Sequence, residues 1–231
     1  MTFALTNVVP WGRSFDEYVA MFALTEADLL GRIVGCGDGP ASFNATATSH
    51  GYAVVSADPI YAFSAAQIRE RVEATTPVIA AEIRANSDEF VWTHFKAVDE
   101  LIDARLAAMR VFLDDFPGGL RSGRYVNAAL PSLPFGARTF DLALSSHFLF
   151  LYSQQHDLAF HVAAIRELTR IAGDVRIFPL FELGAVASRH LADVTDTLTR
   201  DGCLVERVRV HYEFQKGGNE MLRILASPDR P

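Results

Sequence analysis

The chain contains the glycine-rich stretch Ile33-Val34-Gly35-Cys36-Gly37-Asp38-Gly39-Pro40. The apolar residues 29–34 predict a strand that enters this turn, and residues 41–51 predict a helix that follows it and ends at a glycine. Residues 52–57 then predict a second apolar strand, which ends at Asp58-Pro59. A strand, a glycine turn, a helix and a strand in this order indicate a βαβ unit with two parallel strands.

The glycines and the acid of this unit together predict a cofactor site. Side chains at Gly35, Gly37 and Gly39 would block a cofactor that approaches the backbone at the carboxyl end of the first strand. The N-terminus of the next helix is expected to offer free amides. Asp58, at the end of the neighbouring strand, can accept hydrogen bonds from both hydroxyls of a ribose. The alternative is a plain turn in which Asp58 caps the helix behind Pro59; with the strand context, we favour cofactor binding.

The rest of the chain predicts further strands around a helical insertion. Residues 61–121 contain no convincing strand and are predicted to be helical, with N-caps at Ser64 and Thr76 and a break at Pro117-Gly118-Gly119. A helix is also expected from Ser14, which Glu17 completes as a capping box. The other predicted strands are 125–130, 140–145, 175–180, 204–214 and 220–226, and the other predicted helices are 157–172 and 185–200.

The last two strands predict the arrangement at the end of the sheet. The Gly-Gly pair in 215–219 indicates an antiparallel hairpin. Its first strand alternates apolar and polar residues, which suits an edge, and its second is nearly all apolar, which suits an inner position beside 175–180. The expected fold is α/β, with a Rossmann-like seven-stranded sheet, mostly parallel, an antiparallel C-terminal hairpin strand and helices on both faces. We expect a single domain over 1–231, in which the insertion 61–121 is a lid or, equally, a dimer surface or an extension of the core.

Composition and charge bound the class of protein. The 231 residues carry a net charge of −7 and are 50% hydrophobic, which excludes disorder and argues against a dedicated nucleic-acid binder. Two cysteines, Cys36 and Cys203, are too few for a disulfide scaffold. The N-terminus carries no secretory signal, and the longest strongly apolar run, 148–152, is too short to span a bilayer. We therefore expect a cytoplasmic protein with no membrane attachment and no nucleic-acid partner.

The glycine turn resembles the first motif of class I S-adenosylmethionine-dependent methyltransferases, through Ile33-Val34-Gly35-Cys36-Gly37-Asp38-Gly39. Asp58 matches the acid after their second strand, and the C-terminal hairpin matches their last two strands. Residues 130–135 and 140–147 resemble their segment from the third strand through the fourth. The resemblance covers nearly the whole chain outside the insertion. More narrowly, the chain resembles a bacterial group of uncharacterised methyltransferase-like proteins.

This resemblance implies a function and a set of binding residues. It implies a methyltransferase that binds S-adenosylmethionine (SAM), in which Gly35, Gly37 and Gly39 hold the methionyl part and Asp58 binds the ribose. Pro59 or Ile60 would pack on the adenine. The remaining implied contacts are Ala129 and Leu130 at the adenine edge and Ser145 and Ser146 facing the reactive methyl group.

Two positions depart from the family pattern. The family usually has an acid two residues before the first glycine, where this chain has Ile33. It also commonly has an acid that accepts from the adenine amine, and neither Ala129 nor Leu130 can do so through a side chain. Asp38, inside the turn, is a candidate for a compensating charge.

A few residues outside these motifs are candidates for chemistry. Methyl transfer from a sulfonium needs a base only when the acceptor must lose a proton, and His147, after the fourth strand, is the candidate base or else a packing residue. Arg13 is a candidate partner for the cofactor carboxylate or else a surface ion pair. His156 and His161 are five residues apart and do not share a helical face, so we expect no metal site. Trp11, Trp92 and Phe95 are candidates for an acceptor pocket or for plain core.

The function expected from these residues is SAM-dependent methyl transfer to an unidentified small-molecule acceptor, with the oligomeric state left open. One alternative is a dinucleotide-dependent oxidoreductase, although the turn has G-x-G-x-G followed by Pro40 instead of the G-x-G-x-x-G fingerprint. The other is a non-catalytic methyltransferase-like protein that acts through a partner, which the missing acid at Ile33 motivates.

Overall fold

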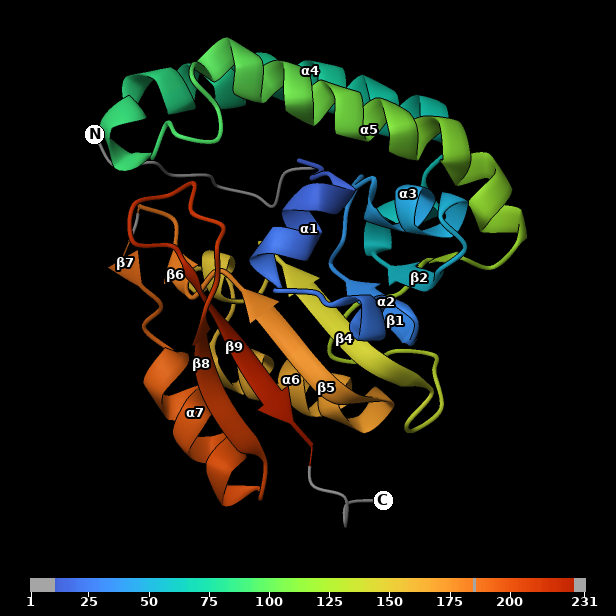
Figure 1. Cartoon of the computed structure of the whole chain (residues 1–231), viewed down its shortest axis with the longest axis vertical. Helices are drawn as coiled ribbons and strands as arrows, with labels where there is room; N and C mark the ends of the chain where they lie inside the picture. The colour runs from blue at the N-terminus through green and yellow to red at the C-terminus, as the bar shows by residue number, and fades with distance from the viewer. Residues whose placement is uncertain (1–10, 185, 227–231) are drawn as a thin grey trace.

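The computed structural model of the chain describes residues 11–184 and 186–226. A seven-stranded sheet lies at its centre, in the order β3-β2-β1-β4-β5-β9-β8 (Figure 1). The strands in this order are β3 (Tyr125–Val126), β2 (Ala53–Ala57), β1 (Arg32–Cys36), β4 (Phe140–Ser146), β5 (Ala172–Phe178), β9 (Glu220–Leu225) and β8 (Leu204–Arg209). A separate antiparallel pair is formed by β6 (Phe181–Glu182) and β7 (Val186–Ala187).

The strand directions confirm the expected fold class. β1 pairs in parallel with β2 on one side and with β4 on the other, and β4 pairs in parallel with β5. β9 runs antiparallel to β5, with Val175 opposite Ile224, and β8 is the edge strand beyond it. Because the chain moves outward from β1 first to β2 and later to β4, the carboxyl ends of β1 and β4 form a switch point, where open α/β sheets bind ligands.

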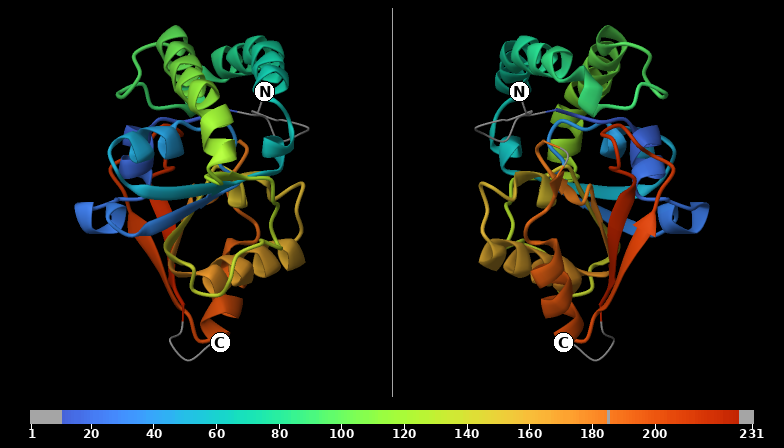
Figure 2. Two further views of the ribbon diagram at one scale, coloured as in Figure 1. Left: turned by 90° about the vertical axis from the view of Figure 1, so that its right-hand side faces the viewer. Right: turned by 90° about the vertical axis from the view of Figure 1, so that its left-hand side faces the viewer.

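Helices cover both faces of the sheet (Figure 2). One face carries α1 (Phe15–Met21), α2 (Glu26–Leu29) and α3 (Phe43–Ser49), and the other carries α6 (Leu158–Ile171) and α7 (Leu191–Arg200). Each set buries its own apolar cluster, with Phe22 and Phe43 against one face and Ile165 and Leu168 against the other. The sheet is therefore apolar on both sides, as parallel sheets usually are.

The insertion forms a third layer above the carboxyl edge of the sheet. Its helices are α4 (Ala65–Ala85) and α5 (Val98–Arg121), which pack side by side (Figure 1). The expected capping box at Ser64 is present. The expected second N-cap at Thr76 is wrong, because Pro77 lies inside α4, where the hydroxyls of Thr75 and Thr76 donate to carbonyls of the preceding turn.

The expected break at 117–119 is also wrong. α5 continues through Pro117 to Arg121, and a Cβ at Gly119 would lie 2.4 Å from the ring of Tyr125. Gly119 therefore permits the close approach of α5 to β3. The short 3-10 helices are η1 (Pro59–Ala62), η2 (Ser87–Glu89) and η3 (Phe150–Tyr152).

Several predicted boundaries differ from the structure. The strand expected over 125–130 keeps only the two residues of β3, and the helix expected over 185–200 begins at Leu191, after β7. The helix expected to end near 172 does so, but β5 starts at once at Ala172 instead of at 175. Residues 1–10, where we expect no secretory signal, and Ala185 lie outside the described residues.

The tip of the insertion is tied to the loop between β8 and β9. The amide of Val91 donates to the carbonyl of Phe214 over 2.7 Å, and the amide of Lys216 donates to the carbonyl of Glu89 over 3.0 Å. The rings of Phe90 and Phe214 stack at 4.8 Å. We call residues 89–91 and 214–216 the clasp. The strand expected to reach residue 214 ends at Arg209 because the chain beyond it leaves the sheet and pairs with the insertion instead.

Candidate functional site

A cavity of about 810 Å³ lies between the carboxyl edge of the sheet and the insertion. Its floor is formed by the turn after β1 and by the chain that follows β2, β3 and β4. Residues of α4 and of the clasp form the opposite wall. This volume is within the range of small-molecule sites, which lie preferentially at the switch point of such sheets.

The cavity brings together ten of the twelve residues that the sequence predicts for the site. Gly35 and Ser145 do not line it, and Ser145 is fully buried within β4. The ten that line it are Arg13, Gly37, Asp38, Gly39, Asp58, Pro59, Ala129, Leu130, Ser146 and His147.

The three glycines of the turn differ in what a side chain at each position would meet. A Cβ at Gly35 would lie 1.9 Å from the carboxylate of Asp38, so this glycine makes room for an acid of the chain itself. Gly37 has a φ of +69°, and a Cβ there would lie 2.8 Å from the ring of Phe148. Only Gly39, with a φ of +54°, has open space where its Cβ would be. Of the three, only Gly39 therefore has the open space that a ligand close to the backbone would need.

The backbone amides of the turn are largely engaged within the protein. The amide of Gly37 donates to Ala57 over 2.9 Å, and that of Ser42 donates to Arg13 over 3.0 Å. The amide of Gly39 donates to Oδ2 of Asp58 over 2.8 Å. α3 begins only at Phe43 and has seven residues. The turn thus differs from the expected cluster of free amides at a helix N-terminus.

Asp58 is held by two backbone amides at the end of β2. Besides Gly39, the amide of Ile60 donates to its Oδ1 over 2.8 Å, so the acid does cap the following 3-10 turn. Burial raises the pKa of Asp58 above its usual value. A carboxylate can accept about four hydrogen bonds, and two positions remain for a ligand. The two amides therefore orient Asp58 toward the cavity and leave part of its hydrogen-bonding capacity for a ligand.

Asp38 is a buried acid without a cationic partner among the described residues. It is 7% exposed, and it accepts from the hydroxyl of Tyr18 over 2.8 Å and from that of Ser56 over 2.6 Å. Burial raises the pKa of Asp38 to about 6, although both hydroxyl donors lower it. The ionised form is therefore stabilised only in part, and a cation in the cavity would stabilise it further.

A buried ion pair lies behind this part of the site. Glu17 of α1 pairs with Arg105 of α5 and accepts from the hydroxyl of Tyr212 over 2.9 Å. Burial raises the pKa of Glu17, but the Arg105 guanidinium outweighs it and lowers that pKa to about 2. Our reading of the sequence missed this pair. The available signal is the position of Arg105 in the apolar stripe of α5, between Leu101 and Met109.

Arg13 has a charge that no acid of the described chain pairs with. Its Nη1 donates to the carbonyl of Trp11 over 3.1 Å, and its Nε is buried with no hydrogen-bond partner in the described part of the chain. Burial and the nearby Arg105 lower the pKa of Arg13 to about 10. The alternative of a surface ion pair is therefore not realised, and the guanidinium remains available to an anion in the cavity.

His147 is held in an uncommon backbone conformation directly after β4. Its φ is +52°, its amide donates to Phe178 over 2.6 Å, and its Nδ1 lies 2.9 Å from the hydroxyl oxygen of Ser146. Burial, with the charges of Arg13 and Arg105, lowers the pKa of His147 well below its usual value. The ring is therefore neutral at pH 7. Its Nε2 has no hydrogen-bond partner among the residues that the structure describes.

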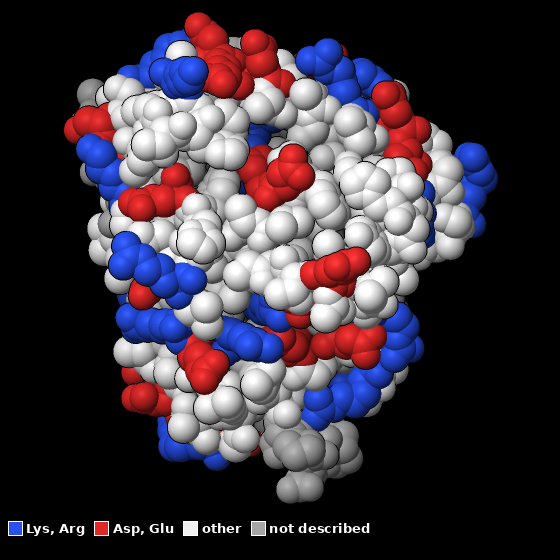
Figure 3. Space-filling model, viewed as in Figure 1, with Lys and Arg blue, Asp and Glu red and all other residues white. Residues whose placement is uncertain are grey.

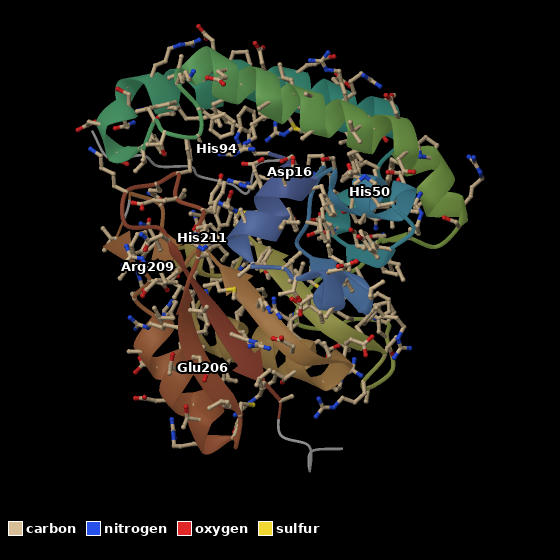
Figure 4. The ribbon with its side chains drawn as sticks, in the orientation of Figure 1. Asp16, His50, His94, Glu206, Arg209 and His211 are labelled. Atoms are coloured by element: carbon tan, nitrogen blue, oxygen red, sulfur yellow. The ribbon has the colours of Figure 1, made fainter. Side chains whose placement is uncertain are left out.

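The three aromatic residues considered for an acceptor pocket lie in different places. Trp11 lines the cavity, whereas Trp92 packs against Phe214 at the clasp and Phe95 lies under the guanidinium of Arg105. Figure 4 shows His94 at the underside of the insertion, above the hairpin that carries Arg209 and His211. Across 11–184 and 186–226, no three His, Cys, Asp or Glu side chains are placed to hold a metal ion.

The surface charges and the helices of the described residues are relevant to nucleic-acid and membrane partners. On the face seen in Figure 3, acidic and basic side chains alternate and do not gather by sign. Of the helices within 11–184 and 186–226, none combines the length and apolarity that crossing a bilayer requires.

Comparison with known proteins finds one curated relative at high coverage. The uncharacterized protein MJ0045 of Methanocaldococcus jannaschii is 33% identical over 221 residues, which are 95% of this chain and 97% of that protein. No protein-family model matches the chain.

Similar solved structures are SAM-dependent methyltransferases. The magnesium protoporphyrin IX methyltransferase ChlM from Synechocystis PCC 6803, crystallised with SAM, has a TM-score of 0.48 at 13% identity, over 92% of this chain and 78% of that one. A putative SAM-dependent methyltransferase from Methanococcus maripaludis has a TM-score of 0.48 at 12% identity, over 94% and 84%. With TM-scores under 0.5, neither likeness decides what this chain does.

Proposed function

This chain belongs to the family of the uncharacterized Methanocaldococcus jannaschii protein MJ0045, and we propose that it is a SAM-dependent methyltransferase with a small-molecule acceptor. One observation carries the proposal. Asp58, fixed by two backbone amides at the end of β2, lines the same cavity as the open turn at Gly39. A carboxylate in this place can accept both hydroxyls of an adenosyl ribose.

The charges of the cavity fit the ends of this cofactor. Arg13, with its unpartnered Nε, is the proposed partner of the methionyl carboxylate. Asp38, which pairs with no cation of 11–184 or 186–226, favours the positive sulfonium. Pro59, Ala129 and Leu130 line the part of the cavity proposed for the adenine. Gly35 contributes by leaving room for Asp38.

The same features argue against a dinucleotide. A pyrophosphate needs free backbone amides at a helix N-terminus. Here the amides of Gly37, Gly39 and Ser42 are engaged, and Asp38 and Asp58 place negative charge at the turn. The geometry therefore favours the methyltransferase over the oxidoreductase.

His147 is the proposed base. When bound, SAM supplies a methyl group activated by a sulfonium sulfur, which leaves as a neutral thioether. His147 is neutral, and its Nε2 has no hydrogen-bond partner among the described residues, so it can take a proton from an acceptor beside Ser146. The mostly apolar wall of the cavity can align the acceptor with the methyl group, which is the main demand of this reaction.

Thermal unfolding with S-adenosylhomocysteine (SAH), SAM and nicotinamide dinucleotides tests the proposal. A ligand at a hundred times its Kd stabilises by about 2.7 kcal/mol, which is roughly 5–10 °C for a chain of this size. We expect this shift with SAH and SAM alone. Asp58→Ala should remove most of it, whereas Asp16→Ala, an exposed acid of α1 (Figure 4), should leave it unchanged.

The other outcomes point to the alternatives. A shift with the nicotinamide dinucleotides would support an oxidoreductase. No shift with any ligand would support a non-catalytic protein that acts through a partner.

A further inference from the structure

The cavity has a second half that the proposed cofactor contacts do not use. We call it the acceptor lobe, and it lies between α4, the clasp and the end of β5. Six of its lining residues are all apolar or aromatic: Trp11, Ile79, Ile83, Phe90, Phe178 and Phe214. Ile79, Ile83 and Phe178 are each at most 3% exposed, so this wall of the lobe is formed by well-packed apolar side chains.

The acceptor lobe lacks a charged group for its ligand. The acids that line the cavity within the described residues are Asp38 and Asp58, and both belong to the half around the glycine turn. Of the cations, Arg13 is proposed to hold the cofactor carboxylate, and Arg71 is exposed on α4, two turns before Ile79. A charged acceptor would lose its hydration here without gaining a partner, which is costly. An ammonium group is disfavoured most, because no carboxylate awaits it.

The aromatic rings of the lobe are arranged in contact with one another. Phe90 and Phe214 stack at 4.8 Å, and Phe178 meets Tyr212 edge to face at 5.7 Å. Offset and edge-to-face contacts at such distances are favourable between aromatic rings, and a planar aromatic ligand can extend them. The lobe therefore fits an aromatic molecule better than an aliphatic one.

The lobe meets the proposed base at Phe178. The ring of His147 packs against that of Phe178 at 5.4 Å, so a ligand in the lobe reaches His147 at the border with the cofactor half. A neutral imidazole with a free Nε2 suits an acceptor that carries a proton to be removed, such as a hydroxyl.

Building on the proposed function, we propose that the acceptor is an uncharged aromatic molecule with a hydroxyl group, which is methylated on oxygen. The hydroxyl proton passes to Nε2 of His147 as an oxygen lone pair bonds to the methyl carbon. The carbon–sulfur bond breaks, and its electron pair stays on sulfur. The products are a methyl ether, SAH and an imidazolium that returns its proton to solvent.

Four probes of one shape test the class of acceptor. They are 2-naphthol, 2-naphthoic acid, 2-naphthylmethylamine and decahydro-2-naphthol, titrated calorimetrically into the SAH complex of the full chain. SAH binding is measured first, so that its absence would count against the proposed function and not against the acceptor class. We expect 2-naphthol to bind at least tenfold more tightly than each of the other three. The acceptor class is overturned if the carboxylate or the amine binds equally well, if the saturated alcohol does, or if no probe binds below 1 mM.

Matched variants locate the binding in the lobe. Phe214→Leu removes the ring that stacks on Phe90 and should weaken 2-naphthol binding about fivefold, with SAH affinity within twofold of the unchanged chain. Phe15→Leu makes the same substitution outside the cavity, where Phe15 stacks on Phe43, and should change neither affinity. Equal 2-naphthol affinity in both variants would place the probe elsewhere and overturn the assignment.

Discussion

Two buried carboxylates beside Tyr18 behave in opposite ways. Glu17 is 3% exposed and has a pKa of about 2, whereas Asp38 is 7% exposed and has a pKa of about 6. Burial raises the pKa of both acids. Glu17 has the Arg105 guanidinium against it, and Asp38 has only the hydroxyls of Tyr18 and Ser56.

The difference separates a structural acid from an acid available to a ligand. Glu17 does not line the cavity, and its charge is neutralised by an arginine of the chain. Asp38 lines the cavity, and no arginine or lysine of the described residues pairs with it. A protein can keep such an acid at a ligand site because the ligand brings the missing charge.

The largest effect is expected from removing the cation of the first acid. Arg105→Met leaves Glu17 buried without a counter-ion and should lower the free energy of unfolding by about 3–5 kcal/mol. Urea unfolding followed by circular dichroism measures the loss. Glu17→Gln combined with Arg105→Met should restore most of it. If the double variant were as unstable as the single one, packing of Arg105 and not its charge would carry the effect.

Removing the charge of the second acid should have the opposite sign. The folded pKa of Asp38 lies above the unfolded value of 3.8, so the unfolded chain releases the proton first and stability falls as pH rises from about 4 through 6. Asp38→Asn has no such titration. Its stability relative to the unchanged chain should therefore increase by ~2–3 kcal/mol between pH 4 and pH 8. Urea midpoints across this range measure it, and a constant difference would show that Asp38 has an ordinary pKa.

The hydroxyl donors of Asp38 predict a smaller loss. Ser56→Ala removes the donor at 2.6 Å and should cost ~1.5 kcal/mol of stability at pH 8, where Asp38 is ionised. The cost should be smaller at pH 4, where the acid is protonated. Ser49→Ala, on the exposed end of α3, is the matched control and should show no pH dependence. An equal loss at both pH values would show that the contribution of Ser56 to stability does not depend on the ionisation of Asp38.

The smallest predicted effect concerns the cofactor itself. SAM carries a sulfonium charge that SAH lacks, so ionised Asp38 should favour SAM. We expect the ratio of SAM to SAH affinity to rise about three- to tenfold from pH 5 to pH 8, measured by calorimetry. The rise should disappear in Asp38→Asn. A ratio that does not change with pH in the unchanged chain would place the sulfonium away from this acid.

The parallel pairing of β1 with β2 and the place of the terminal hairpin could be predicted from sequence, because local patterns indicate them. The glycine turn and the apolar runs identified β1 and β2, and the nearly continuous apolar run of β9 indicated its inner place. Local rules predict a helix start at Thr76-Pro77 and a helix break at Pro117, but the packing of α4 against α5 and of Gly119 against Tyr125 outweighs them.

The candidate site was predicted in part for the same reason. Asp58 and Gly39 could be recognised as candidate site residues because they occupy fixed positions in a βαβ unit. The pairing of Glu17 with Arg105 was not, because the two residues are 88 positions apart and meet only through the placement of the insertion. The need for glycine at position 35 could not be predicted either, because it depends on the orientation of the Asp38 side chain.

The clasp has a consequence for how new specificities arise in this family. Two segments far apart in the sequence, 89–91 and 214–216, share backbone hydrogen bonds at one wall of the cavity. An insertion transplanted from a relative without its hairpin loop would arrive with unmatched donors and acceptors. If the cavity binds the acceptor as proposed, an exchange of the insertion between relatives would preserve acceptor choice only when 89–91 and 214–216 are exchanged together.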